Sequence, residues 1–280
     1  MADAVGIVCH PRIEIGQGPV VEARAQLERH GFKVWTYCST AQERPGALDA
    51  NLEGTRLIIS IGGDGTLLWT AEQAATAGIP VLGVNAGRLG FLTEVRLADA
   101  TAALDRWLAG DFGLQRRAVL EARTADSHFA ALNDVVVHKG MDLNLIRIEV
   151  MVDGQDAGRF DADGAIISTA TGSTGYALSL GGPILHPQVR AITYLPLNPH
   201  SLFNRPVVLP EDSKVAVRLP DAPGVLTCDG HRMISLEPGA EALIAVKGGV
   251  DLVRFPGGQN FFSLLRQKIR WGLPLTDGTA

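Results

Sequence analysis

Hydrophobic and polar residues are patterned in two different ways along the chain, and the pattern changes near residue 113. In the first part, short β-branched runs are separated by stretches in which apolar residues recur every three or four positions. The runs predict buried strands, and the longer stretches predict amphipathic helices. The predicted strands are 5–9, 32–37, 57–61 and 80–84, and the predicted helices are 20–30, 66–77 and 97–109. This order is typical of βαβ units with a parallel sheet.

After residue 113 the pattern becomes that of an antiparallel β domain, with turn signals such as Asp153-Gly154 between short apolar runs. The predicted strands are 119–123, 132–137, 145–152, 165–168, 207–209, 215–219, 225–228, 243–246 and 250–255. We therefore predict an α/β N-terminal domain with a parallel sheet, residues 1–113, plus a mainly β (sandwich) C-terminal domain, residues 114–257. Helical spacing over 261–271 predicts a helix within 258–280 that packs back on the first domain.

The segment Gly62-Gly63-Asp64-Gly65-Thr66 lies between a predicted strand and a predicted helix. Backbone N–H groups and the helix dipole at such a turn bind phosphate. A carboxylate there would repel phosphate unless it holds a metal or accepts a proton from a nucleophile, so Asp64 indicates phosphoryl transfer. The Lys of a P-loop and the third Gly of a dinucleotide fingerprint are both absent. The alternative is a tight turn with Asp64 as a helix N-cap.

Two further polar segments suit a nucleotide. The loop 169–176 follows a predicted strand and offers small hydroxyl groups and the ring of Tyr176, which together can bind a purine and a ribose without a charged side chain. Asn133 and Asp134 place an amide beside a carboxylate, a pairing that suits ribose hydroxyls or a base edge. The alternatives are a loop capped by its own hydroxyl groups and an ordinary turn.

Composition narrows the class of protein. The 280 residues are 46% hydrophobic and 20% charged, as in a globular protein, and the net charge of −5 indicates neither a nucleic-acid partner nor an anionic membrane surface. Three widely spaced cysteines, Cys9, Cys38 and Cys228, predict neither a disulfide framework nor a zinc site. Because no signal-peptide pattern and no apolar run of membrane-spanning length is found, we expect a cytoplasmic location.

The motifs taken together resemble the NAD kinase family over nearly the whole chain. They are the segments 6–11, 62–66, 83–92, 133–138, 163–183 and 228–230. The first glycine motif is shared with diacylglycerol and sphingoid lipid kinases and, more loosely, with phosphofructokinases. The stretch 169–183 is what distinguishes NAD kinases. Two positions depart from the family pattern: Asp134 stands where Glu is usual, and Gly175 stands where Ala is frequent.

The resemblance implies a kinase that phosphorylates the 2′-hydroxyl of the adenosine ribose of NAD to give NADP, with ATP or polyphosphate as donor and Mg²⁺ as cofactor. It implies that Asp64 activates this hydroxyl and that Asp163 reaches the ligand near a subunit interface of a homodimer or homotetramer. The implied NAD-binding residues are Asp64, Gly65, Asn133, Asp134, Asp163, Thr171, Thr174, Gly175 and Tyr176. The implied phosphate-binding residues are Gly62, Gly63, Gly65 and Thr66, and no metal ligand is assigned.

Two other functions remain as alternatives. A lipid kinase with the same glycine motif would carry a later Gly-Thr-Gly/Ala-Asn-Asp motif, which this chain lacks. A non-catalytic NAD(P)-binding sensor would gain nothing from Asp64, because a carboxylate beside a phosphate weakens binding.

Overall fold

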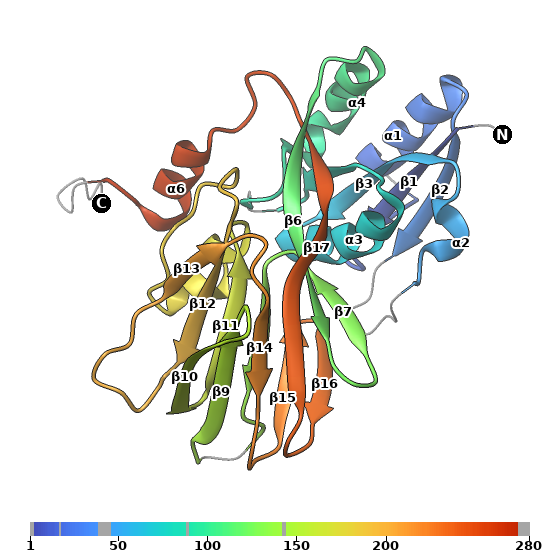
Figure 1. The fold of residues 1–280 in the computed structure, drawn as a ribbon. Coiled ribbons are helices and arrows are strands. Elements are labelled where there is room, and N and C mark those ends of the chain that lie inside the picture. Colours follow the sequence, from blue (N-terminus) through green and yellow to red (C-terminus); the bar gives the residue numbers. More distant parts are fainter. Residues whose placement is uncertain (1–2, 17, 39–45, 88–89, 142–143, 274–280) are drawn as a thin grey trace.

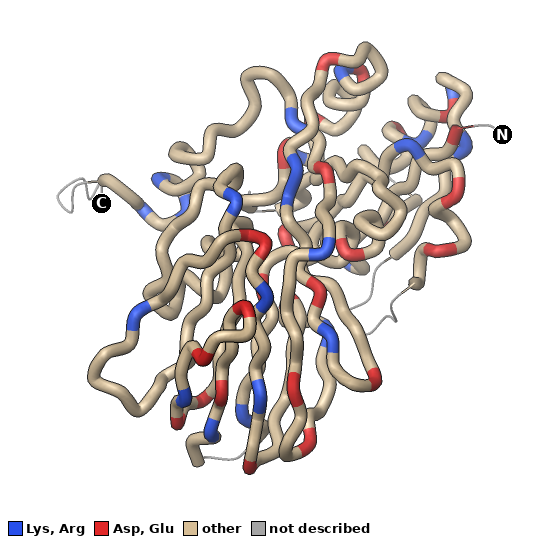
Figure 2. The backbone as a smooth tube through the Cα atoms, viewed as in Figure 1, with Lys and Arg blue, Asp and Glu red and all other residues tan. Residues whose placement is uncertain are grey.

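The computed structural model describes residues 3–16, 18–38, 46–87, 90–141 and 144–273. It consists of an α/β half and a β half joined by one shared sheet (Figure 1). This arrangement confirms the predicted fold class, whereas the residue limits of the two domains stay a prediction. Figure 2 shows Lys and Arg interspersed with Asp and Glu over both halves.

The α/β half contains parallel strands in the order β4-β3-β1-β2. The strands are β1 (Ala4–Cys9), β2 (Lys33–Cys38), β3 (Thr55–Gly62), β4 (Val81–Asn85) and the short β5 (Val95–Arg96). The helices are α1 (Gly18–Arg29), α2 (Asp49–Leu52), α3 (Asp64–Ala77) and α4 (Ala100–Leu108), the last preceded by a 3₁₀ turn at Leu97–Asp99. Apolar residues of α1 and α4 pack with one face of the sheet, and α3 packs with the other.

The β half is a sandwich of two sheets around one apolar core. Its strands are β6 (Gly113–Arg123), β7 (His128–Ala131), β8 (Asp134–His138), β9 (Ile146–Val152), β10 (Gln155–Ala162), β11 (Gly164–Thr169), β12 (Ala191–Leu197), β13 (Val207–Pro210), β14 (Val215–Arg218), β15 (Gly224–Cys228), β16 (Arg232–Leu236) and β17 (Glu241–Arg254). One sheet is antiparallel in the order β13-β12-β11-β8-β15-β16.

Strand β17 joins the two halves. Its first residues pair with β14, it pairs with β6 along most of its length, and Leu252 pairs in parallel with Val81 of β4. The prediction of two separate strands here is wrong, because the chain continues as one strand through a bulge between Val246 and Gly249. Gly248 supplies the positive φ of 144° at this bulge, a backbone conformation that other residues rarely adopt.

The strands that the sequence analysis missed are β5, β7, β10, β12 and β16. The segment of β10 reads Gln-Asp-Ala-Gly-Arg-Phe-Asp-Ala and is mostly exposed, so it lacks the apolar alternation that marks a strand. The segment forms a strand because its backbone pairs antiparallel with that of β9.

The last helix, α6 (Phe261–Ile269), was predicted at this place, although the predicted segment 258–280 extends beyond the described residues. Leu264 and Leu265 are its buried residues, and the ring of Phe261 lies 5.1 Å from that of His186. Leu264 also lines a cavity with Phe91 of the α/β half. No helix in the described part of the chain is long and apolar enough to cross a membrane.

Candidate active site

Asp64 is the first residue of helix α3, and its side chain is held by a loop 27 residues further along the chain. Its carboxylate accepts hydrogen bonds from the backbone N–H of Phe91 at 2.8 Å and of Leu92 at 3.1 Å. A Cβ at Gly90 would collide with the Asp64 carboxylate, so this approach requires glycine. The N-cap is Gly63, and the alternative of Asp64 as N-cap is therefore wrong.

The glycines around Asp64 differ in whether packing requires a residue without a Cβ. A Cβ at Gly62 would collide with the side chain of Thr66, so packing requires this glycine. Gly63 and Gly65 are exposed, have no positive φ, and have open space where a Cβ would lie. The fold itself therefore does not require glycine at these two positions, and the open space lies at the N-terminus of α3.

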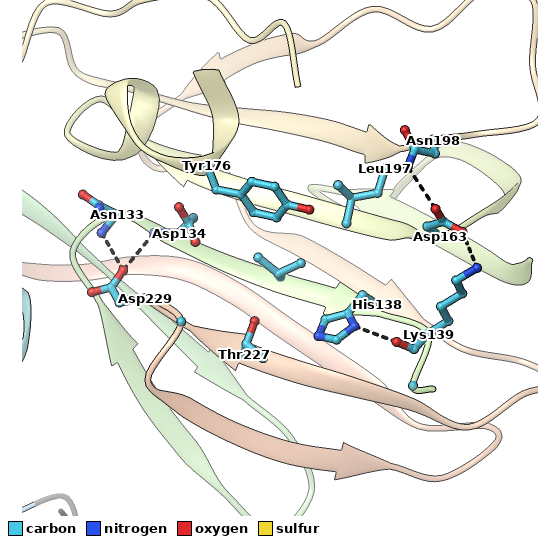
Figure 3. Close-up of a pocket in the computed structure, with 13 residues that line it drawn as sticks. Asn133, Asp134, His138, Lys139, Asp163, Tyr176, Leu197, Asn198, Thr227 and Asp229 are labelled. Atoms are coloured by element: carbon cyan, nitrogen blue, oxygen red, sulfur yellow. Dashed lines mark hydrogen bonds and ion pairs between the residues drawn. The ribbon is translucent and has the colours of Figure 1, made fainter. Parts of the chain in front are cut away.

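A cavity of about 550 Å³ lies in the β half (Figure 3). Strands β8, β12 and β15 with the segments next to them supply most of its walls. Asp163, just before β11, and Tyr176, at the start of the short helix α5 (Tyr176–Ser179), supply the rest. The lining residues are Asn133, Asp134, Val136, His138, Lys139, Gly140, Asp163, Tyr176, Leu197, Asn198, Thr227, Asp229 and Gly230. Four predicted NAD-binding residues, Asn133, Asp134, Asp163 and Tyr176, thus line one cavity.

Asp134 and Asp229 place two carboxyl groups at one end of this cavity. Asp229, at a positive φ of 49°, accepts the backbone N–H groups of Leu132, Asn133 and Asp134 at 2.7, 2.8 and 3.0 Å. Burial raises the pKa of Asp229, and the three hydrogen bonds offset only part of that shift. Burial and the charge of Asp229 raise the pKa of Asp134 to about 7. Asp229 therefore fixes the backbone that carries Asn133 and Asp134.

A buried ion-pair cluster connects this turn to helix α3. Glu72 of α3 lies 3.0 Å from Nε2 of His231 and accepts a hydrogen bond from Nε of Arg232 at 3.2 Å. Burial lowers the pKa of His231, but the hydrogen bond to Glu72 and the charges of Glu72 and Asp229 outweigh this effect and raise it. The helix that begins at Asp64 is thus tied to the turn that contains Asp229.

At the other end of the cavity, Asp163 is bound by two residues that the sequence analysis did not single out. The ammonium group of Lys139 lies 2.7 Å from its carboxylate, and the amide of Asn198 donates to it at 2.9 Å. These two contacts lower the pKa of Asp163. Asn198 has a positive φ of 42°, a conformation that Asn adopts more readily than most residues. An Asn at such a position is therefore explained by the turn alone, and the sequence gives no separate indication of binding.

The remaining predicted residues lie around the loop 169–176. Thr171 and Thr174 do not line the 550 Å³ cavity but a much smaller one, together with Phe91, Leu92 and Arg117. Thr171 also lines a separate cavity of about 840 Å³. A Cβ at Gly175 would lie 3.3 Å from the side-chain nitrogen of Asn133, so the loop is tightly packed there. Because Phe91 and Leu92 also bind Asp64, this smaller cavity connects the loop with the start of α3.

Among the described residues, no three His, Cys, Asp or Glu side chains converge as a metal site. A divalent cation here would take oxygen ligands from a substrate's phosphates and from at most one or two carboxylates, as Mg²⁺ commonly does. Asp64 is the carboxylate next to the open glycine turn. The residues therefore fit a cation that is carried by phosphate rather than held in a protein cage.

Two stretches of the chain match family models. Residues 6–112 match the ATP-NAD kinase N-terminal domain, and residues 132–250 match the ATP-NAD kinase C-terminal domain. The chain belongs to the NAD kinase family. An NAD kinase of Gemmatimonas aurantiaca is 45% identical over 234 residues, which cover 80% of each chain. An NAD kinase of Heliobacterium modesticaldum is 44% identical over 230 residues, covering 77% of this chain and 79% of the relative.

Solved structures agree with this NAD kinase fold. Yeast NADH kinase complexed with NADH superposes with a TM-score of 0.86 at 22% identity, covering all of this chain and 91% of the yeast chain. An NAD kinase from Archaeoglobus fulgidus in complex with ATP gives 0.76 at 26% identity, covering 95% and 98%. The family models and the relatives at 44% and 45% identity show that phosphorylation of NAD is the activity of this chain. The same findings favour it over the lipid kinase and the non-catalytic sensor.

Proposed function

We propose that the chain transfers the γ-phosphoryl group of ATP to the 2′-hydroxyl of the adenosine ribose of NAD, and that Asp64 accepts the hydroxyl proton. In this step the 2′-oxygen forms a bond to the γ-phosphorus, the bond between that phosphorus and the bridging oxygen breaks, and ADP leaves. The single observation that carries the proposal is the position of Asp64 between an open glycine turn and the N–H groups of Phe91 and Leu92.

The geometry of Asp64 suits a general base. Two backbone donors fix both carboxylate oxygens, so the side chain is oriented before substrate binds. A carboxylate that accepts two hydrogen bonds still has lone pairs with which it can take a proton. Phosphoryl transfer depends mainly on positioning and on charge neutralisation, and a proton acceptor next to the attacking hydroxyl completes these requirements.

Gly63 and Gly65 are proposed to admit the donor phosphates. Their open space lies at the start of a 14-residue helix, where backbone N–H groups and the helix dipole favour anions. Gly62 and Thr66 complete this turn, and Oγ1 of Thr66 is buried with no hydrogen-bond partner among the described residues. Since the motif 62–66 contains no Lys or Arg, Mg²⁺ on the donor phosphates would neutralise their charge there.

NAD is proposed to bind along the line from the 550 Å³ cavity of the β half to Asp64. Asn133, Asp134, Asp163 and Tyr176 line the cavity, whose volume of about 550 Å³ suits part of a dinucleotide. Thr171, Thr174 and Gly175 belong to the loop between that cavity and Phe91. The loop would then bring the adenosine ribose toward the Asp64 carboxylate.

A homodimer or homotetramer is proposed from the surface near Asp163. The segment that follows Asn198 carries Leu202 and Phe203, whose exposed fractions are 97% and 91%. Val207 and Val208 of the edge strand β13 are also exposed. Large apolar side chains gathered next to a binding cavity are typical of a protein interface. Polyphosphate as donor and a cytoplasmic location stay predictions.

A turnover assay tests the proposed function. Purified protein with NAD, ATP and Mg²⁺ should form NADP and ADP in equal amounts, measured with an NADP-specific dehydrogenase and a coupled ADP assay. Parallel reactions replace ATP by polyphosphate and NAD by diacylglycerol. Formation of phosphatidic acid without NADP, or ADP release without any phosphorylated acceptor, would contradict the proposal. Light scattering on the same sample gives the number of subunits.

A further inference from the structure

Arg117 of β6 is a buried cation with few partners. Its side chain is only 4% exposed. One terminal nitrogen donates to Oε1 of Gln115 at 2.8 Å, and the other lies 3.5 Å from the hydroxyl of Thr171. Its Nε is buried without a hydrogen-bond partner, and no carboxylate of the described residues forms an ion pair with it.

A second arginine shares the same neutral acceptor. Arg254, at the end of β17, donates from Nε to Oε1 of Gln115 at 3.1 Å. Gln115 and Arg117 lie on one face of the β6–β17 ladder, opposite Leu252 and Val250. Arg254 has its own counter-ion, since it lies 2.8 Å from Glu94. The second oxygen of Glu94 accepts the backbone N–H of Phe255. Both oxygens of Glu94 therefore have partners other than Arg117.

This arrangement is costly for a protein without a bound anion. Burial and the nearby charge of Arg254 lower the pKa of Arg117 to about 9. A buried charge is normally paired or bound to a ligand, because the interior solvates it poorly. The two guanidinium groups share one neutral amide oxygen and have only the carboxylate of Glu94 as counter-ion. One of the two positive charges is therefore not balanced.

A cavity of about 380 Å³ adjoins both guanidinium groups. It lies between the ends of β6 and β17, the segment 186–188 and helix α6. Its polar lining includes Gln115, Arg117, Arg254, His186, Gln188 and Asn260, together with Glu94, whose carboxylate is already paired with Arg254. Nδ1 of His186 accepts the backbone N–H of Gln188, so its Nε2 carries the hydrogen. Oδ1 of Asn260 accepts the N–H of Phe262 at the start of α6, and its amide hydrogens remain donors.

We propose that this cavity binds a phosphate or polyphosphate group, with Arg117 and Arg254 as its ligands. Guanidinium groups bind phosphate through pairs of parallel hydrogen bonds, and the amide and imidazole donors match the remaining oxygens. The site differs from the glycine turn at Asp64, because none of residues 62–66 lines it.

Leu92 connects the proposed anion site with Asp64. Its backbone N–H donates to the Asp64 carboxylate, and its carbonyl accepts a hydrogen bond from Arg254. An anion that binds Arg254 therefore acts on the same residue that helps to orient Asp64. The anion has two candidate sources: the far phosphates of the phosphoryl donor, or a separate phosphate compound that binds beside it.

Binding of inorganic pyrophosphate, measured by calorimetry at constant ionic strength without Mg²⁺, NAD or ATP, tests the site. Gly65→Asp serves as the background, because the added carboxylate repels phosphate from the glycine turn and its Cβ meets no neighbour within 4 Å. We expect saturable binding in this background that weakens about 10-fold or more when Arg117→Gln is added. Arg116→Gln is the matched control, since its side chain is exposed and paired with Asp251; it should leave binding unchanged.

Absence of saturable binding in the Gly65→Asp protein, or equal affinity in the two arginine variants, overturns the proposal. Should Arg117→Gln not fold, Arg117→Lys keeps the charge but loses the planar fork, and should also bind more weakly than the background protein. The source of the anion follows from the KM for ATP of the single variant Arg117→Gln. A raised KM for ATP identifies the donor phosphates as the anion, and an unchanged KM identifies a separate phosphate compound. Because the binding measurement needs no turnover, its failure is distinguishable from failure of the proposed kinase reaction.

Discussion

The backbone N–H of Leu92 donates to the carboxylate of Asp64 at 3.1 Å, and this contact joins two motifs that lie 28 residues apart. In the sequence, the residues that follow the predicted strand 80–84 look like a second glycine-rich loop. In the structure Gly90 and Leu92 form part of the environment of Asp64, because only a residue without Cβ allows the loop to come this close. The orientation of the proposed base is therefore set by the loop after β4 as well as by its own helix.

The first prediction concerns Tyr176, whose side chain is 49% exposed and lines the 550 Å³ cavity of the β half. Because it is not a core residue, Tyr176→Ala should leave the thermal midpoint nearly unchanged. Its contacts with NAD would exist in the ground state and the transition state alike, so KM for NAD should rise about 5- to 150-fold with little change in kcat. Tyr176→Phe is the control that keeps the ring. A destabilised protein with a normal KM for NAD would move Tyr176 from the binding site to the scaffold.

The second prediction concerns the buried carboxylate of Glu72. Its removal takes away the buried carboxylate that both Arg232 and His231 contact, so Glu72→Ala should lower the free energy of unfolding by about 3–5 kcal/mol. Glu28→Ala is the matched control, because its pair with Arg24 is exposed and should contribute less than about 1 kcal/mol. Urea denaturation of both variants measures the difference. Equal losses in the two variants would show that the cluster does not tie α3 to the β half.

The third prediction follows from the pKa of Asp134, which burial and Asp229 raise from 3.8 to about 7. Between these two values the folded protein binds more protons at this carboxyl than the unfolded chain does. Its contribution to stability is therefore fully present below about pH 4 and is lost as the pH rises through about 7. Asp134→Asn does not titrate, so the free energy of unfolding of the unaltered protein should fall relative to this variant from pH 5 to pH 8. A constant difference over that range would mean that Asp134 titrates normally.

The fourth prediction concerns the metal. Since the motif 62–66 has no Lys or Arg, we expect the charge of the donor phosphates at this turn to be offset by a divalent cation. EDTA should abolish NADP formation, and excess Mg²⁺ should restore it. Circular dichroism should show no unfolding on chelation, because no cluster of three metal-ligating side chains occurs in the described ranges. Unchanged turnover after chelation would refute the requirement.

The strand–turn–helix around Asp64 could be predicted because its signals are local. A β-branched run, three glycines and a run of helix formers follow one another, and the structure places β3, the turn and α3 there. The loop 169–176 was predictable for the same reason. The predicted residues Asn133, Asp134, Asp163 and Tyr176 meet in one cavity, although the sequence alone does not show that they are neighbours.

Other parts of the site could not be read from the sequence because their contacts are distant. Asp229 lies in the segment 228–230, which the family resemblance includes without assigning it a role. Its Asp-Gly sequence indicates only a turn, yet Asp229 binds the backbone of Asn133, which precedes it by 96 residues. Glu72 reads as a helix surface residue, and only its contact with Arg232 shows that it is buried between the two halves. Arg117 gives no local signal, because its lack of a counter-ion is a property of three-dimensional surroundings.

The measurement that tests the central claim most directly is the kcat of Asp64→Asn with NAD, ATP and Mg²⁺. The variant keeps the size of the side chain but cannot accept the hydroxyl proton. We expect it to fold and to bind NAD with near-normal affinity while kcat falls about 10²-fold or more, the scale of a lost general base. Asp163→Asn is the comparison, since that carboxylate lines the far end of the cavity and should affect KM for NAD more than kcat. Near-normal turnover by Asp64→Asn would contradict the assignment of Asp64 as the proton acceptor.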